Sequence, residues 1–155
     1  MTRAIAPVVG SVLLLLCVLG LATTVAVVST GFSSGLSAPG SHVSVSLSVD
    51  AETNRFVFTH DGGERLDPRT LTLVVAVDGT PLDHQPPVPF FSAEGFHSAP
   101  TGVFNEASTR EWTVGGSASF VVAGSNSPTP DRGSTVTVEL YEDGRPIARA
   151  ETTAR

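Results

Sequence analysis

The side chains of this sequence that could carry catalytic or metal chemistry are scattered along the chain. Four histidines occur without the close pairing that zinc sites use: His42, His60, His84 and His97. The Asp-Pro-Arg-Thr segment at residues 67–70 and the other acidic loops lack the ligand spacing of an EF-hand. We therefore expect no metal site and no cofactor.

His60 and Asp61 come closest to a catalytic pair, because an adjacent imidazole and carboxylate could act as general acid and base. Gly62 and Gly63 follow them directly, and this pattern is typical of a turn between two strands. We favour the turn. The chain also lacks a phosphate-binding glycine loop, so the sequence predicts a protein that is not an enzyme.

Charge is distributed unevenly along the chain. Its 155 residues include 15 acidic and 9 basic side chains, a formal net charge of -6 that disfavours nucleic acid as a partner. Apart from Arg3, every Asp, Glu and Arg lies at or beyond Asp50. The mean hydropathy of +0.19 is nevertheless high for a soluble protein of this size. These features divide the chain into an uncharged N-terminal segment and an acidic body.

The uncharged segment is long enough to cross a membrane. As a helix, residues 7–29 would span about 35 Å, against roughly 30 Å for the hydrocarbon core of a bilayer. We expect a transmembrane helix at residues 5–30, because inside lipid only a helix would satisfy the backbone of this single segment. Small residues four apart would let a second helix pack closely: Ala6 with Gly10, and Ala22 with Ala26.

Two other N-terminal signals fit the residues less well. A cleaved secretory signal has an apolar region of about 7 to 15 residues and a more basic start, whereas here one arginine precedes a longer run. A lipoprotein signal would need a small residue before Cys17, and Leu16 stands there. We interpret Cys17, the only cysteine, as a buried hydrophobic side chain.

The acidic body has the pattern of a β domain. After a Gly/Ser/Pro-rich linker at residues 31–41, valines and a leucine alternate with serines over residues 42–50. Further strands are expected at residues 55–60, 71–78, 117–123, 135–141 and 146–152. Asp-Gly steps, above all Asp143-Gly144, indicate tight turns. The expected fold class is mainly β: a long N-terminal transmembrane helix followed by an antiparallel, immunoglobulin-like β-sandwich at residues 42–155.

Residues 81–113 are irregular and rich in phenylalanine. Phe90, Phe91, Phe96 and Phe104 could form an adhesive surface patch, or they could close the sandwich from beneath a long loop. We favour burial, because aromatic side chains are mostly buried in folded domains. We expect Trp112 to anchor the following strand in the same way.

Residues 3–28, RAIAPVVGSVLLLLCVLGLATTVAVV, resemble the N-terminus of archaeal type IV pilins, particularly those of halophiles. The match to the family's opening runs residue by residue through Arg3, Ala4, Ile5, Ala6, Pro7, Val8, Val9 and Gly10. Residues 55–79 and 99–122 also resemble segments of these pilins. Val9 stands where bacterial members carry a glutamate, which favours the archaeal branch.

The resemblance implies processing and assembly. A prepilin peptidase would cut between Ala4 and Ile5, next to Arg3, and would remove residues 1–4 as a leader. The helix at residues 5–30 would then remain as membrane anchor and later as filament core. The positive-inside rule places Arg3 in the cytoplasm and the β domain, residues 42–155, outside the cell. The implied partners are the membrane, other pilin subunits, the peptidase and the pilus assembly machinery.

The implied function is that of a structural pilus subunit for surface adhesion, first in the cell membrane and then in an extracellular pilus. One alternative stays open on the residues alone. The same chain could be a membrane-anchored extracellular β-sandwich that binds a ligand and never polymerises.

Overall fold

The computed structural model describes residues 43–108 and 110–155, which belong to one compact unit. The predicted leader, transmembrane helix and linker, residues 1–41, lie outside the described residues. Among the residues that are described, no helix is long and apolar enough to cross a membrane.

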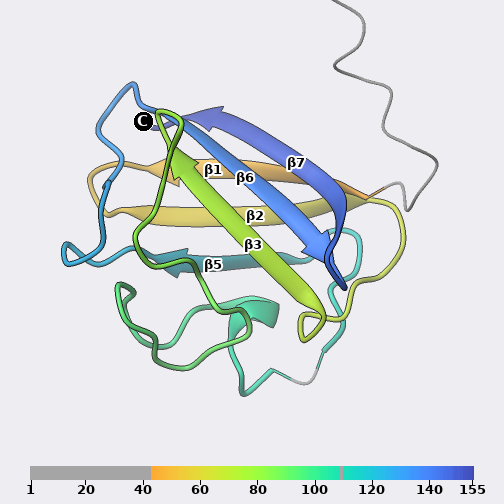
Figure 1. Cartoon of the computed structure of the whole chain (residues 1–155). Coiled ribbons are helices and arrows are strands. Elements are labelled where there is room, and N and C mark those ends of the chain that lie inside the picture. Colours follow the sequence, from red (N-terminus) through yellow and green to blue (C-terminus); the bar gives the residue numbers. More distant parts are fainter. Residues whose placement is uncertain (1–42, 109) are drawn as a thin grey trace, which may run out of the picture. The chain divides into compact units, whose positions relative to one another are not determined.

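The described residues form two antiparallel β-sheets (Figure 1). One sheet contains, in spatial order, β1 (Ser44–Asp50), β2 (Arg55–Gly62) and β5 (Ser117–Val121). The other contains β4 (Thr80–Pro81), β3 (Leu71–Val77), β6 (Thr135–Glu142) and β7 (Arg145–Thr153). The one helical element in this part of the chain is the single 3-10 turn η1 (Gly102–Phe104). The mainly β, antiparallel prediction is therefore confirmed.

A single hydrophobic core lies between the sheets, and strand alternation explains which residues enter it. In β2, Phe56, Phe58 and His60 are buried, whereas the residues between them face outward. In β6 the same alternation buries Val136 and Val138. In Figure 1 the strands of the four-stranded sheet cross in front of those of the three-stranded sheet. Each fully buried large side chain contributes about 1.5–3 kcal/mol relative to exposure.

The predicted strands are all present, and their ends differ from the prediction by at most two residues. Asp143 and Gly144 form the predicted turn between β6 and β7, with φ of 48° and 78°. Positive φ at both positions is the requirement of the hairpin turn that matches strand twist. The two-residue strand β4 was not predicted, because Thr80 and Pro81 are too few to show any alternation.

The long loop between β4 and β5 carries the phenylalanines whose burial was uncertain. Phe90, Phe96 and Phe104 are buried, which confirms that they close the core. The ring centroids of Phe96 and Phe104 lie 5.4 and 6.2 Å from that of Phe120 in β5. Phe91 is the exception, with 57% of its surface exposed.

Two buried polar side chains fasten this irregular part of the chain. Trp112 is fully buried, as predicted, and its Nε1 donates a hydrogen bond of 2.8 Å to the carbonyl of Gly116. The Asn126 side chain accepts from the N–H of His84 at 3.0 Å and donates to the carbonyls of His84 and Gly95. Asn126 therefore connects the loop segments around His84 and Gly95, which do not belong to any strand.

Candidate functional site

The processing and packing residues predicted from the sequence lie outside the described residues. They are Arg3, Ala4 and Ile5 at the proposed cut, and Ala6, Gly10, Ala22 and Ala26 on the predicted helix. Their roles stay predictions.

The structure corrects the interpretation of His60 and Asp61. Both belong to β2, which continues to Gly62, so the turn predicted at these residues was wrong. The strand continues because β2 stays paired with β1 as far as Ser44 and Gly62. On its other edge, the N–H and C=O of His60 bond to the backbone of Gly116 and Gly115, at 3.0 and 2.7 Å. Neighbouring side chains of a strand point to opposite faces, and accordingly His60 is buried whereas Asp61 is exposed. The two side chains therefore do not form an acid and base pair.

The buried imidazole of His60 has an unusual environment. Neither ring nitrogen has a hydrogen-bond partner among the described residues. Its nearest aromatic neighbour is the indole ring of Trp112, at a centroid distance of 5.6 Å. This histidine contributes to packing in the core.

A depression of about 410 Å³, with a mixed polar and apolar lining, lies over β5 at the start of β2. Polar side chains from three places line it: Thr53 and Arg55 at the start of β2, His97, Ser98 and Thr101 in the loop before η1, and Ser119 in β5. We call it the Arg55 depression. These residues share no motif, so their sequence does not predict that they lie together.

The loop wall of the Arg55 depression is held by backbone hydrogen bonds to the free edge of β5. The N–H of His97 donates to the carbonyl of Val121 at 2.9 Å, and that of Thr101 donates to the carbonyl of Ser119 at 2.8 Å. Gly102 follows with φ of 63°, and a Cβ placed there would lie 2.2 Å from the carbonyl oxygen of Ser117. Only glycine lets the backbone of the loop come this close to β5. Gly102 therefore allows the loop to pack directly against that strand.

The Arg55 depression is lined by one arginine, Arg55, and by no carboxylate. The Nη1 of Arg55 donates a long hydrogen bond of 3.4 Å to the Ser119 hydroxyl, whose oxygen lies 2.8 Å from that of Thr101. The remaining guanidinium N–H groups have no protein acceptor among residues 43–108 and 110–155.

The carboxylate of Asp50 makes no ion pair within 4.0 Å of Arg55 in the described part of the chain, although the two residues are paired across β1 and β2. Its Oδ1 accepts hydrogen bonds from the N–H groups of Thr53 and Glu52, at 3.2 and 2.9 Å. These backbone bonds, that from Thr53 above all, hold the pKa of Asp50 below its usual value. Asp50 is therefore engaged in stabilising its own hairpin.

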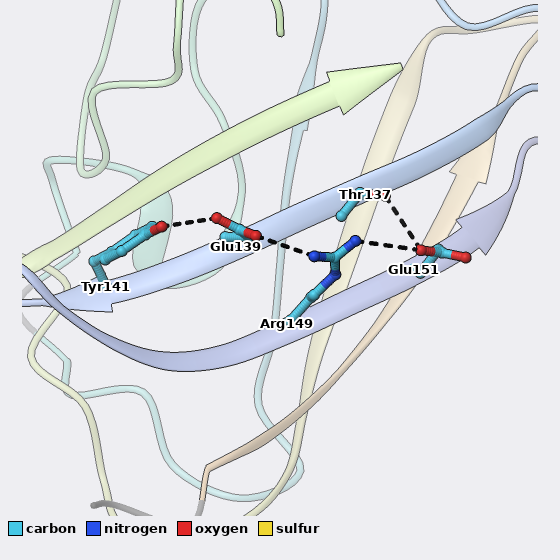
Figure 2. Close-up of polar contacts among 5 residues, drawn as sticks. All are labelled: Thr137, Glu139, Tyr141, Arg149 and Glu151. Atoms are coloured by element: carbon cyan, nitrogen blue, oxygen red, sulfur yellow. Dashed lines mark hydrogen bonds and ion pairs between the residues drawn. The ribbon is translucent and has the colours of Figure 1, made fainter. Parts of the chain in front are cut away.

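A second group of polar side chains lies on β6 and β7 (Figure 2). Arg149 bridges two carboxylates, with its Nη1 3.2 Å from Glu139 Oε1 and its Nη2 3.7 Å from Glu151 Oε2. Thr137 donates to Glu151 at 3.4 Å, and the Tyr141 hydroxyl donates to Glu139 at 2.7 Å. Arg149 offsets one of the two carboxylate charges, so the network keeps a formal charge of -1 on the surface of the sheet.

The position of Tyr141 in this network perturbs the pKa of its phenol. The hydrogen bond to Glu139, and the negative charge of that carboxylate, raise the pKa of Tyr141 above its usual value. The phenol therefore stays protonated at neutral pH and is not an activated nucleophile. We interpret the network as a cross-strand contact that stabilises the sheet.

Within the described part of the chain, no group of three or more His, Cys, Asp or Glu side chains could hold a metal ion. Comparison with known proteins finds no family model and no curated protein that matches the chain.

Proposed function

We propose that this chain is a structural subunit of an archaeal type IV pilus, which assembles through its N-terminal hydrophobic helix and serves surface adhesion. The observation that carries the proposal is the opening at residues 3–10, Arg-Ala-Ile-Ala-Pro-Val-Val-Gly, directly before an uncharged segment of bilayer length. A charged residue and a small residue before the apolar run favour a cut that keeps the helix. A secretory signal would lose it.

The β domain supports a protein in which the helix assembles and a separate domain is exposed. Its buried residues form a core of their own, so it can fold without contributions from the predicted helix. We propose that the domain is immunoglobulin-like, a subclass supported by the strand orders β1-β2-β5 and β4-β3-β6-β7 in two antiparallel sheets. A domain of this kind, placed outside the cell after a transmembrane helix at residues 5–30, would form the surface of a filament.

Assembly in this proposal is an exchange of contacts. In the membrane the helix contacts lipid, and in the filament it contacts other helices. Lipid and leucine side chains are equally apolar, so close van der Waals packing at small residues must favour helix association. Ala6, Gly10, Ala22 and Ala26 would provide that packing. The partners are then other pilin subunits, the prepilin peptidase and the assembly machinery, and no enzymatic activity is involved.

The alternative is a membrane-anchored extracellular domain that binds a ligand and does not polymerise. The Arg55 depression favours it, because a surface depression is a feature of a binding domain and assembly does not require one. The two functions share the anchor and the domain, and they differ in whether subunits leave the membrane.

Shearing of cells that make pili distinguishes the two functions. The double variant Gly10→Leu, Ala22→Leu keeps the segment apolar, so membrane insertion should persist while the amount in the sheared extracellular fraction falls. The double variant Val12→Leu, Val18→Leu is the matched control, because it adds the same residue type at positions that are already bulky. The proposal fails if the unmodified chain occurs only in membranes, and the packing assignment fails if both double variants shear off equally.

A further inference from the structure

We propose that the Arg55 depression binds the carboxylate or sulfate group of an acidic sugar. The depression belongs to the β domain alone, so the proposal goes beyond pilus assembly and holds whether or not the chain polymerises. In a filament, this site would be carried on the exposed domain of every subunit.

The size of the depression suits a ligand of this class. Its volume of about 410 Å³ lies within the range of roughly 300–1,000 Å³ that small-molecule sites occupy. Such sites are mostly apolar when they bind apolar ligands. Here the lining is about equally polar and apolar, with the hydroxyl groups of Thr53, Ser98, Thr101 and Ser119 beside Ala99, Pro100, Phe120 and Val121. The matching ligand therefore combines hydrogen-bonding groups with apolar C–H surface, as a sugar ring does.

Arg55 determines the charge of the ligand. A guanidinium presents five N–H donors in a planar fork that matches a carboxylate or sulfate through two parallel hydrogen bonds. At Arg55 one of these donors makes the long 3.4 Å contact with Ser119. No carboxylate lines the depression, and the nearest one across the hairpin, Asp50, is occupied by backbone N–H groups. An oxyanion of a ligand would therefore meet a guanidinium that no carboxylate of the described residues pairs with directly.

The hydroxyl groups determine the rest of the ligand. Each serine or threonine hydroxyl can donate one hydrogen bond and accept others, as the hydroxyls of a sugar ring require. The backbones of Thr101 and Ser119 are paired, and their hydroxyl oxygens lie 2.8 Å apart. These hydroxyl groups are therefore positioned before any ligand binds. The net charge of -6 for the whole chain disfavours the binding of polymers of high negative charge. A sugar with a single acidic group is therefore the best match.

The test is a ¹⁵N–¹H NMR titration of the full chain in neutral detergent micelles, with D-glucuronate, D-glucose 6-sulfate and neutral D-glucose. We expect saturable shifts of the Thr101, Ser119 and Val121 amides with one or both acidic sugars, at a dissociation constant on the order of 1 mM. D-glucose should cause no saturable shift there, because it lacks the oxyanion. Comparison of the two acidic sugars shows which oxyanion is preferred.

A matched pair of variants separates a built site from general attraction. Arg55→Gln should weaken binding about tenfold or more. Arg145→Gln makes the same charge change at an exposed position in β7, on the other sheet, and should leave binding unchanged. The proposal is overturned if neither acidic sugar gives saturable shifts, if glucose binds as tightly, or if both variants weaken binding equally. Every lining residue of the depression belongs to the β domain, so none of these results depends on pilus formation.

Discussion

Replacing His60 by leucine should stabilise the β domain, although His60 is fully buried. Its two ring nitrogens have no hydrogen-bond partner among the described residues, and an unsatisfied buried polar group costs about 1–3 kcal/mol. The variant would lose the aromatic contact with Trp112, which is worth about 0.5–1.5 kcal/mol. Leucine is similar to histidine in volume, so neither a large cavity nor overpacking offsets the gain. We expect the free energy of unfolding to rise by about 1 kcal/mol.

Urea unfolding of a fragment of residues 41–155 measures this change. Trp112 is the only tryptophan and is fully buried, so its fluorescence reports the loss of the core. His97→Leu is the matched control at an exposed position and should change stability by less than about 0.5 kcal/mol. A loss of stability in the His60 variant would refute the reasoning, because it would mean that the imidazole makes favourable polar contacts in the folded domain.

Three further changes test how the loops and hairpins are held. Asn126→Ala should lower the free energy of unfolding by about 2 kcal/mol, because buried backbone groups of the loop lose their partner; urea unfolding measures it, and an unchanged midpoint would contradict it. Gly102→Ala should lower the thermal midpoint more than Gly79→Ala, because both positions have positive φ but only the first places a Cβ against Ser117. Asp50→Ala should lower the thermal midpoint at neutral pH. Because the pKa of Asp50 is below 3.8 in the folded domain, its contribution is present above pH 3.8 and is lost as the pH falls through the folded pKa. The two midpoints should therefore converge in acid, and a constant gap would exclude a role for the carboxylate charge.

The strands could be predicted from the sequence because one face of each sheet packs on a single core. In residues 44–50 and 135–142 this appears as apolar residues at every second position. The Asp143-Gly144 turn was equally visible, because positive φ at two successive residues restricts the residue types. These signals are local, so no knowledge of the tertiary structure was needed.

The end of β2 was mispredicted because two local signals conflict there. The glycine pair at residues 62 and 63 indicates a turn, but pairing of Gly62 with Ser44 of β1 extends the strand, and His60 bonds to Gly115 and Gly116 on the other edge. These partners belong to other segments, and the sequence does not show which segments will meet.

The Arg55 depression was missed for the same reason. It exists because residues 97–101 pair with the free edge of β5, and that loop has no alternating pattern. Arg55 itself looks like any exposed arginine at the start of a strand. Only the tertiary structure places it beside the hydroxyl groups of Thr101 and Ser119.

The most direct test of the pilin proposal is the N-terminal residue of the mature protein, determined by mass spectrometry of material from membranes and pili. Cleavage between Ala4 and Ile5 predicts Ile5 as the first residue, with the whole apolar segment retained. Met1 or Thr2 at the terminus, in cells with an active prepilin peptidase, would contradict the proposed cut. A terminus beyond Ser29 would show that the segment is a discarded secretory signal, and the pilin proposal would then be wrong.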